Sequence, residues 1–405
     1  MRTHEVVILG AGPAGLSAAA ELKRLGHRDI VILDREQQGG GIPRHCGHTG
    51  YGLLQFGRLM TGPDFARRLV DTVSDLDLRL GHTALKLEPN GRIQVTGPNG
   101  PETLQAQKVL LAMGARETPR SARLVSGTRP WGVMNTGTLQ QFAYLHGKAP
   151  FQRPIVIGSE LVAFSTLLTL GHVGVKAVAM IEERERITAW RPGDWVARVA
   201  FGVPVMTGCS ELTILGQDRV EGLSFKRHGK MRVLEGDGIV LTGQFRPETA
   251  LLTQSHLELD PGTRGPVIDQ LYRCTDPSYF AGGNLLRGVE TAGQCYREGK
   301  SAAHVIHAAL ADKLPPPVPP IRLEAAGTLS YVYPQRLTGR GPYDPLLFKA
   351  RASVATKGTL RVLADGREIW SRPIRVLPER RIAWRVPAVD LTGVHHLTID
   401  LSPRE

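Results

Sequence analysis

The sequence contains few cysteines, and none of them is spaced for metal binding or for dithiol chemistry. The 405 residues include only Cys46, Cys209, Cys274 and Cys295, and no two of these form a C-x-x-C motif. This spacing argues against a disulfide framework, a zinc site or a cysteine-ligated iron–sulfur cluster within the chain. We therefore predict no metal site, and the scattered thiols favour a reducing cytoplasm.

Long hydrophobic runs are also missing. The longest apolar stretches are far shorter than the roughly 20 residues that a transmembrane helix needs, so we predict no membrane span. An apolar run of strand length begins within a few residues of Met1, and we therefore expect no signal peptide. A hydrophobic content of 41% and a charged content of 22% are typical of a globular protein. The length suggests two or three domains.

A basic patch is missing too, although the formal net charge is +12. Nucleic-acid binding would require basic residues gathered on one face and interleaved with aromatics. Here Arg and Lys are spread along the chain, and the densest clusters, such as Arg380-Arg381, are short or mixed with Glu. We predict a solvated basic surface and no nucleic-acid partner; attraction of an acidic partner or substrate is the alternative.

The amino-terminal stretch has the pattern of a dinucleotide-binding unit. The apolar run Val6–Leu9 leads into Gly10-Ala11-Gly12-Pro13-Ala14-Gly15, a helical segment follows, and a second apolar run ends at Asp34. In this motif the first glycine makes the tight turn, the second admits the pyrophosphate, and the third lets helix and strand pack closely. The helix start holds phosphates, and the acidic residue binds ribose hydroxyls. A βαβ unit that binds no ligand is the alternative.

A second unit of the same kind begins at Ile155 and carries an acidic residue at the critical turn. Its turn reads Gly158-Ser159-Glu160, so a carboxylate stands where the motif has its second glycine. Two like charges about 4 Å apart repel by about 1 kcal/mol even in water. Glu182 and Glu183, after the next strand, would also disfavour a 2′-phosphate. We predict a retained fold whose NAD(P) site is lost.

The two units resemble the flavoproteins with two dinucleotide-binding domains that include glutathione and thioredoxin reductases. The resemblance covers residues 1 to about 312 and is carried by GAGPAG with Asp34, KVLLAMGA, IVIGSELVA, and YFAGGN followed by a helix. It implies an α/β fold with FAD on the first unit, and Asn284 replaces the aspartate that the family places on the ribityl chain. The implied FAD-binding residues are Gly10, Gly12, Pro13, Ala14, Gly15, Asp34, Arg35, Gly41, Ala112, Gly114, Gly283, Asn284, Thr291 and Ala292.

The resemblance and a proline-rich stretch together suggest domain boundaries. We expect an FAD-binding domain from residues 1–117 and 265–313, interrupted by an NAD(P)-binding-like domain at 118–264. Residues 314–320, LPPPVPP, read as a semi-rigid linker. Beyond it, short alternating strands over residues 321–405 predict a small all-β module that folds independently.

A narrower resemblance concerns GGGIPRHCGHTGYG, AVAMIEE and GNLLRGVETAGQCYREG. These segments look like the FAD subunits of hydrogen cyanide synthase and of heteromeric hydroxyproline, proline and opine dehydrogenases. The resemblance implies a small-molecule substrate and partner chains, either a second flavoprotein subunit or a small iron–sulfur subunit. No cysteine follows Cys295, so any cluster must belong to another chain.

The glycine-rich loop at 39–52 supplies the candidate catalytic residues Arg44, His45, Cys46 and His48. A histidine could relay a proton, and Arg44 could stabilise a reduced flavin or a substrate carboxylate. Arg44, His45 and His48 could instead form hydrogen bonds with carbonyl groups of the loop. Tyr51 stands where a C-x-x-x-x-C reductase has its second cysteine, so a dithiol relay is not expected, and Cys46 suits a packed residue better than a nucleophile.

The sequence thus predicts the FAD-carrying subunit of a heteromeric dehydrogenase for amine, imino-acid or opine-type substrates. The alternatives are a stand-alone NAD(P)H-dependent FAD reductase and a non-catalytic flavin-binding scaffold.

Overall fold

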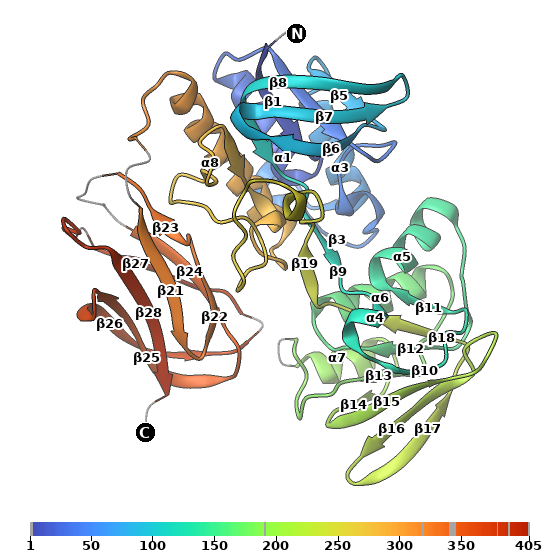
Figure 1. Ribbon diagram of the computed structural model, residues 1–405. Coiled ribbons are helices and arrows are strands. Elements are labelled where there is room, and N and C mark those ends of the chain that lie inside the picture. The colour runs from blue at the N-terminus through green and yellow to red at the C-terminus, as the bar shows by residue number, and fades with distance from the viewer. Residues whose placement is uncertain are drawn as a thin grey trace. The chain divides into compact units, whose positions relative to one another are not determined.

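The structure is a computed structural model that describes residues 3–189, 192–316, 320–339, 346–378, 380–387 and 389–403 (Figure 1). Residues 317–319 of the expected linker lie outside the described residues. The chain divides into two compact units. The first unit consists of Met1–Gly41, Arg68–Ala115 and Pro247–Glu405, and the second of Ile42–Arg67 and Arg116–Arg246.

The first unit is built on a sheet in the order β5-β2-β1-β8-β7-β6, with β20 paired to β8. Strands β1, β2, β5, β8 and β20 run parallel, whereas β6 and β7 form an antiparallel meander with β8. The central strands are apolar on both faces, as buried parallel strands must be. The strands are β1 (Thr3–Leu9), β2 (Ile30–Asp34), β5 (Asp77–Leu80), β6 (Thr83–Glu88), β7 (Arg92–Gly97), β8 (Gly100–Leu111) and β20 (Tyr279–Ala281).

Two long helices of the first unit pack on each other. A side chain on Gly299 of α8 would lie 2.1 Å from the Ala14 carbonyl oxygen of α1, so glycine is needed for this close approach. The Ser17 hydroxyl donates to the Tyr296 carbonyl across the same interface, at 2.9 Å. The helices of this unit are α1 (Pro13–Arg24) and α8 (Ala292–Leu310), with 3-10 turns η2 (Pro89–Gly91), η4 (Leu252–Gln254) and η5 (Gly283–Leu285).

The second unit repeats the plan of the first. Its parallel sheet has the order β11-β18-β12-β13-β14, and a separate sheet has the order β10-β15-β16-β17. These strands are β10 (Ser126–Gly127), β11 (Val133–Asn135), β12 (Pro154–Ile157), β13 (Ala179–Ile181), β14 (Val205–Met206), β15 (Cys209–Leu215), β16 (Gly222–Arg227), β17 (Lys230–Glu235) and β18 (Gly238–Leu241).

Helical segments accompany these sheets, and residues 42–67 add a small ribbon in which β3 pairs with β4. Helix α3 begins in this segment and continues across the boundary into the first unit. The elements are η1 (Ile42–His45), β3 (Thr49–Tyr51), α2 (Leu53–Phe56), β4 (Met60–Thr61), α3 (Gly62–Asp71), α4 (Arg120–Arg123), α5 (Thr136–Gln140), the π-helical turn η3 (Gln141–Leu145), α6 (Leu161–His172) and α7 (Gly193–Ala200).

The chain passes between the units through two short paired strands, β9 (Ala115–Glu117) and β19 (Phe245–Pro247). Residues 42–67 pack with the second unit, whereas the sequence-based boundaries put them in the first. The contacts also place no boundary at the proline-rich stretch. The expected domain boundaries remain a prediction.

The carboxyl-terminal region is all-β, as the sequence predicts. One sheet has the order β23-β21-β28-β25-β26 and the other β22-β24-β27, and side chains from both sheets share one core. The strands are β21 (Ile321–Gly327), β22 (Leu329–Tyr333), β23 (Arg336–Leu337), β24 (Leu346–Ala352), β25 (Thr356–Ala364), β26 (Arg367–Val376), β27 (Ile382–Val386) and β28 (His396–Pro403).

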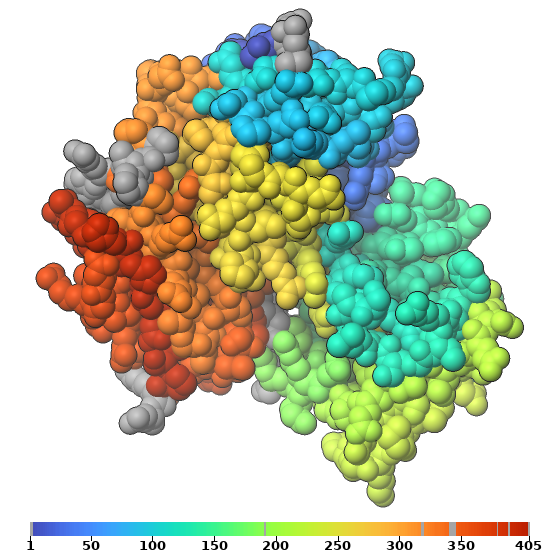
Figure 2. All heavy atoms as spheres, viewed as in Figure 1, coloured from blue at the N-terminus to red at the C-terminus, as the bar shows by residue number. Residues whose placement is uncertain are grey.

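This β module is anchored to the rest of the first unit. Tyr333 is buried in the core of the dinucleotide-binding part, and the Gln335 side chain accepts a hydrogen bond from the Ile268 N–H at 3.1 Å. Arg273 donates to the Thr338 hydroxyl at 2.7 Å and to the Asp269 carboxylate at 2.8 Å. In the space-filling view the yellow surface meets the orange surface of the module (Figure 2). The module is therefore joined to its unit by buried polar contacts.

Among the described residues, no helix combines the length and the apolar composition needed to cross a membrane. The two dinucleotide-type units, with the second inserted in the first, and the β module confirm the predicted fold class.

Candidate functional site

The turn after β1 leaves space at one glycine and none at the other two. A Cβ on Gly10 would lie 2.4 Å from the Ala112 carbonyl oxygen, and one on Gly15 would lie 1.9 Å from the Gly10 carbonyl oxygen. A Cβ on Gly12 would meet nothing closer than the Gly41 Cα at 4.0 Å. The side of the turn at Gly12 is therefore open, as the binding of a pyrophosphate requires.

The start of α1 completes this phosphate cradle. Gly12 is the N-cap and Pro13 opens the helix, so the missing N–H of proline falls where no intrahelical partner exists. Ala14 and Gly15 are buried, and the first turn contains no acidic side chain. The N–H groups of the first turn and the positive end of the helix dipole thus face the turn, and no acidic side chain of that first turn competes for them. These features fit a dinucleotide pyrophosphate.

The carboxylate of Asp34 lies at the end of β2, beside the same turn. Its Oδ2 accepts from the Ala11 N–H at 2.7 Å, and its Oδ1 accepts from the Glu36 N–H at 2.9 Å. Each oxygen keeps a second lone pair with which to bind a ribose hydroxyl. The neighbouring Arg35 lies 3.7 Å from the Glu248 carboxylate.

Three further predicted glycines line the edge of the sheet. Gly41 has φ +63°, and a Cβ there would lie 2.9 Å from the Gly12 Cα. Gly114, just after Ala112 at the end of β8, has φ +74° and accepts from the Glu248 N–H at 2.9 Å. A Cβ on Gly283, which follows β20, would lie 2.8 Å from the Ala14 Cβ. Glycine at positions 41 and 283 thus allows the chain to pack closely against the cradle.

The segment before α8 holds the remaining predicted cofactor residues. The Asn284 side chain bonds both backbone groups of Glu290: its Oδ1 accepts from the N–H at 2.8 Å, and its Nδ2 donates to the carbonyl at 3.2 Å. Thr291 caps α8 by accepting from the Gln294 N–H at 3.3 Å, and Ala292 begins the helix. The side chain predicted for the ribityl chain therefore also fixes this loop.

The four candidate catalytic residues lie in the second unit, whereas all the predicted FAD-binding residues lie in the first. His45 and Cys46 are buried, and Arg44 and His48 are partly buried. The His48 Nδ1 lies 2.9 Å from the Thr49 carbonyl oxygen, the loop-carbonyl contact that was the alternative to a catalytic role.

Cys46 is buried, and its thiol is hydrogen-bonded. Its Sγ donates to the Gln140 Oε1 at 3.3 Å. Burial raises the pKa of its thiol to about 11, which the hydrogen-bonding side chains of Tyr51 and Gln140 only partly offset. A nucleophilic or redox-active cysteine needs a lowered pKa and access to solvent. The surroundings favour the packed residue over the nucleophile.

In the second unit, the turn corresponding to the phosphate cradle contains a buried carboxylate. Glu160 is the N-cap of α6, and its Oε2 accepts from the Ser159 N–H at 3.1 Å. A Cβ on Gly158 would lie 2.9 Å from Oε2, and one on Gly243 would lie 2.2 Å from Oε1. The side chain therefore lies between the two glycine turns. Burial raises the pKa of Glu160.

A second carboxyl group beside this turn escaped the sequence analysis. Glu117 accepts hydrogen bonds from the Gly137 N–H at 2.8 Å and the Gly243 N–H at 3.2 Å. Burial raises its pKa to about 7, and the charge of Glu160 adds to the shift. The only sequence signal was an acidic residue soon after the strand that ends KVLLAMGA.

Glu182, at the end of β13, is also satisfied internally. Its carboxylate accepts from the Ser159 hydroxyl, from the Arg184 N–H at 2.9 Å and from the Thr188 hydroxyl at 3.2 Å. The second unit therefore presents several buried carboxyl groups where a dinucleotide would place its phosphates and ribose.

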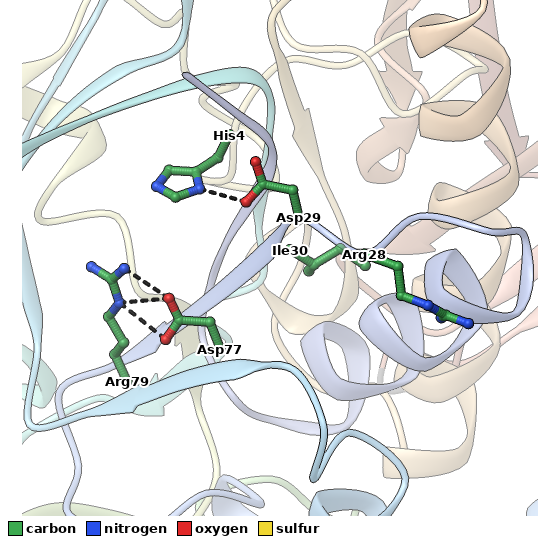
Figure 3. A pocket seen from close by; sticks show the side chains of 6 residues that line it. All are labelled: His4, Arg28, Asp29, Ile30, Asp77 and Arg79. Atoms are coloured by element: carbon green, nitrogen blue, oxygen red, sulfur yellow. Dashed lines mark hydrogen bonds and ion pairs between the residues drawn. The ribbon is translucent and has the colours of Figure 1, made fainter. Parts of the chain in front are cut away.

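A cavity of about 350 Å³ lies at the opposite edge of the first sheet (Figure 3). Its walls come from the amino ends of β1, β2 and β5, whereas ligands of open α/β sheets bind outside the carboxyl ends. Four of its polar side chains are paired, His4 with Asp29 at 2.7 Å and Arg79 with Asp77 at 2.7 Å, and Arg28 donates to the Lys23 carbonyl at 3.0 Å. The lining residues are His4, Arg28, Asp29, Ile30, Asp77 and Arg79. We assign this cavity no function.

Comparison with known proteins identifies the family. The family model "Pyridine nucleotide-disulphide oxidoreductase" matches residues 4–299. The chain belongs to this family. It is therefore an oxidoreductase, and the predicted resemblance is confirmed. The β module lies beyond the matched residues.

Individual relatives are distant. The chain is 26% identical over 307 residues to the NAD-dependent dihydropyrimidine dehydrogenase subunit PreT of Escherichia coli, covering 75% of this chain and 68% of that protein. It is 25% identical over 323 residues to an opine oxidase subunit of Rhizobium meliloti, covering 71% and 60%. The structure of T. acidophilum thioredoxin reductase superposes with a TM-score of 0.64 at 22% identity, covering 76% of this chain and 99% of that one. This structural likeness concerns the fold alone.

Within the described part of the chain, no group of three or more His, Cys, Asp or Glu side chains is placed to hold a metal ion.

Proposed function

We propose that this oxidoreductase is the FAD-carrying subunit of a heteromeric dehydrogenase that oxidises an amine, imino-acid or opine-type substrate. The observation that carries the proposal is the cradle at Gly12, open to a pyrophosphate and flanked by Asp34 and the start of α1. We propose the fourteen residues named above as its FAD site.

Oxidation of such a substrate converts a carbon–nitrogen single bond to a double bond and releases two electrons and two protons. Bound FAD would supply the two-electron acceptor. The chain's own residues would hold the dinucleotide and move protons. We propose His48 for proton exchange through its Nε2, because it is less buried than His45 and the Thr49 carbonyl contacts its Nδ1. We propose Arg44 for binding a substrate carboxylate.

The cysteines disfavour disulfide reduction. All four, each of which is described, are free and buried. Cys46, in the loop that resembles a reductase loop, has a thiol pKa raised to about 11 by burial, so almost none of it is thiolate near neutral pH. Electrons would therefore pass to a partner rather than through a dithiol.

The acidic turn disfavours NAD(P)H as the electron donor. Glu160 lies between Gly158 and Gly243, where an incoming pyrophosphate would need both space and N–H donors, and Glu117 already accepts from the Gly243 N–H. The stand-alone NAD(P)H-dependent reductase remains a second candidate, because the E. coli relative is named as NAD-dependent.

Two of the named relatives are subunits, which supports the proposal that this protein has partner chains. We propose that the electron acceptor is a second flavoprotein subunit or a small iron–sulfur subunit, and that the protein is cytoplasmic. A flavin-binding scaffold without turnover is the remaining alternative.

Anaerobic stopped-flow spectroscopy tests the electron donor. The flavin of the purified protein should stay oxidised on mixing with millimolar NADH or NADPH, and a panel of opines, imino acids and amines should bleach it when co-purifying partner chains are present. Rapid bleaching by NADH alone would favour the stand-alone reductase. No bleaching by any donor would favour the scaffold.

A further inference from the structure

The loop that leads into α8 contains a strained residue. Val289 has φ +76°, in the left-handed region that a β-branched side chain rarely adopts. Such a conformation is strained and persists only when surrounding contacts impose it. The Asn284 side chain supplies part of this restraint by bonding both backbone groups of Glu290.

Three basic side chains of the β module supply contacts to the same loop and helix. Arg351, on β24, donates to the Val289 carbonyl at 3.3 Å. Arg381, just before β27, donates to the Glu290 carboxylate at 2.7 Å. Lys349, also on β24, donates to the Glu298 carboxylate of α8 at 2.7 Å. Figure 1 shows these strands in the orange-red module.

The Lys349 contact is the most buried of the three. The side chains of Lys349 and Glu298 are 9% and 2% exposed. Arg287 reaches the same carboxylate at 2.5 Å and also pairs with Glu290 at 3.2 Å. Both cations lie over the Tyr333 ring, with the Arg287 Cζ at 4.5 Å and the Lys349 Nζ at 5.3 Å from its centroid. Although burial alone would raise the pKa of Glu298, Arg287 and Lys349 hold it below its ordinary value.

A buried ion cluster of this kind is costly to break. Removing one partner leaves an uncompensated charge in a low-dielectric environment, which is strongly destabilising. The Lys349–Glu298 contact joins the β module to the second turn of α8, and the loop before α8 carries Asn284 and Thr291, two of the residues that we assign to the flavin. The module is therefore coupled to the candidate site through named contacts.

We propose that Lys349, Arg351 and Arg381 form a clamp that fixes the loop at 284–291 and the start of α8, so that the β module sets the affinity and the reduction potential of the flavin. This inference rests on the proposed FAD function. Lys349, Arg351 and Arg381 are then positioning residues. The β module is a structural part of the cofactor site rather than a detachable docking domain.

The variant Lys349→Met removes the charge and keeps most of the length of the side chain. Releasing the loop should weaken FAD binding to the full-length protein by about tenfold, which corresponds to about 1.4 kcal/mol. It should also move the flavin reduction potential. Lys349→Arg should restore most of both properties. The matched control Lys357→Met, at an exposed position on β25 of the same module, should change neither.

Hydrogen exchange of the apo-protein gives a readout that does not depend on flavin. Lys349→Met should speed exchange in peptides covering residues 284–296 and leave β25 and β28 protected, which also shows that the variant is folded. If Lys349→Met does not fold, Arg381→Gln serves instead, because the Arg381 side chain is 37% exposed and its loss should be tolerated.

The clamp would be overturned if the folded variant kept the FAD affinity, the flavin reduction potential and the hydrogen exchange of the loop that the wild-type protein has. If the wild-type protein binds no FAD, the proposed function fails, and the exchange of the loop still tests the clamp separately.

Discussion

Glu117 should make the stability of the second unit fall as the pH rises through neutrality. Burial raises the pKa of this carboxyl from 4.5 to about 7. The folded second unit therefore binds more protons than the unfolded chain between these two values. The stability contributed by the protonated carboxyl is fully present below about pH 4.5 and is lost as the pH rises through about 7. The full loss is about 3.5 kcal/mol, since one pKa unit corresponds to about 1.4 kcal/mol.

Glu117→Gln should remove this dependence at a fixed cost. The amide keeps the shape but offers one acceptor oxygen, so either the Gly137 N–H or the Gly243 N–H loses its partner. An unsatisfied buried donor costs about 1–3 kcal/mol. We expect the variant to be less stable than the wild type at about pH 4.5. We expect its stability to stay constant up to about pH 8, where the wild type has lost the contribution of the protonated Glu117.

Hydrogen exchange of the central strands β12 and β18, corrected for the intrinsic rate at each pH, measures the opening free energy of this unit alone. Glu235→Gln, at an exposed position on β17, is the control and should follow the wild type. A wild-type stability that stays flat between pH 5 and 8, or an equal fall in Glu117→Gln, would refute the burial of a neutral carboxyl at this turn.

Four further variants test the rest of the site and the β module. Gly12→Val should abolish FAD binding and leave the fold intact, because its Cβ enters open space. Gly15→Ala should instead unfold the turn, because its Cβ would lie 1.9 Å from a carbonyl oxygen. Flavin absorbance and circular dichroism separate the two results. Glu160→Gly should raise NADH affinity measured by calorimetry, and an unchanged, undetectable affinity would mean that another group closes the turn. Truncation after residue 313 should lower the melting temperature and flavin retention together, because it removes the buried Tyr333 and Lys349; a stable, flavin-retaining fragment would instead support an independent β module.

The elements that the sequence predicted are those whose signals are local. The apolar runs and the Gly10–Gly15 turn predict a βαβ unit within about 30 residues, and the second unit repeats the same local pattern. The alternation after the proline-rich stretch likewise predicts strands from neighbouring residues alone. These predictions of fold and family are confirmed by the structure and the family match.

The features that the sequence did not reveal depend on contacts between distant residues. Glu117 meets the Gly243 N–H, and Lys349 meets Glu298, only because the fold brings separate segments together. The Asn284 side chain was expected on the ribityl chain, and its bonds to Glu290 depend on the turn before α8. Residues 42–67 have no clear periodicity that would assign them to the second unit.

The identity of the released chromophore tests the central claim most directly. The protein purified under native conditions is denatured with acid, and the supernatant is analysed by chromatography and mass spectrometry. Release of FAD, at about one per chain in the wild type and absent from folded Gly12→Val, is the expected result. FMN in the supernatant, flavin retained on the precipitated chain, or a wild-type protein that takes up no FAD would contradict the assignment of the cradle at Gly12.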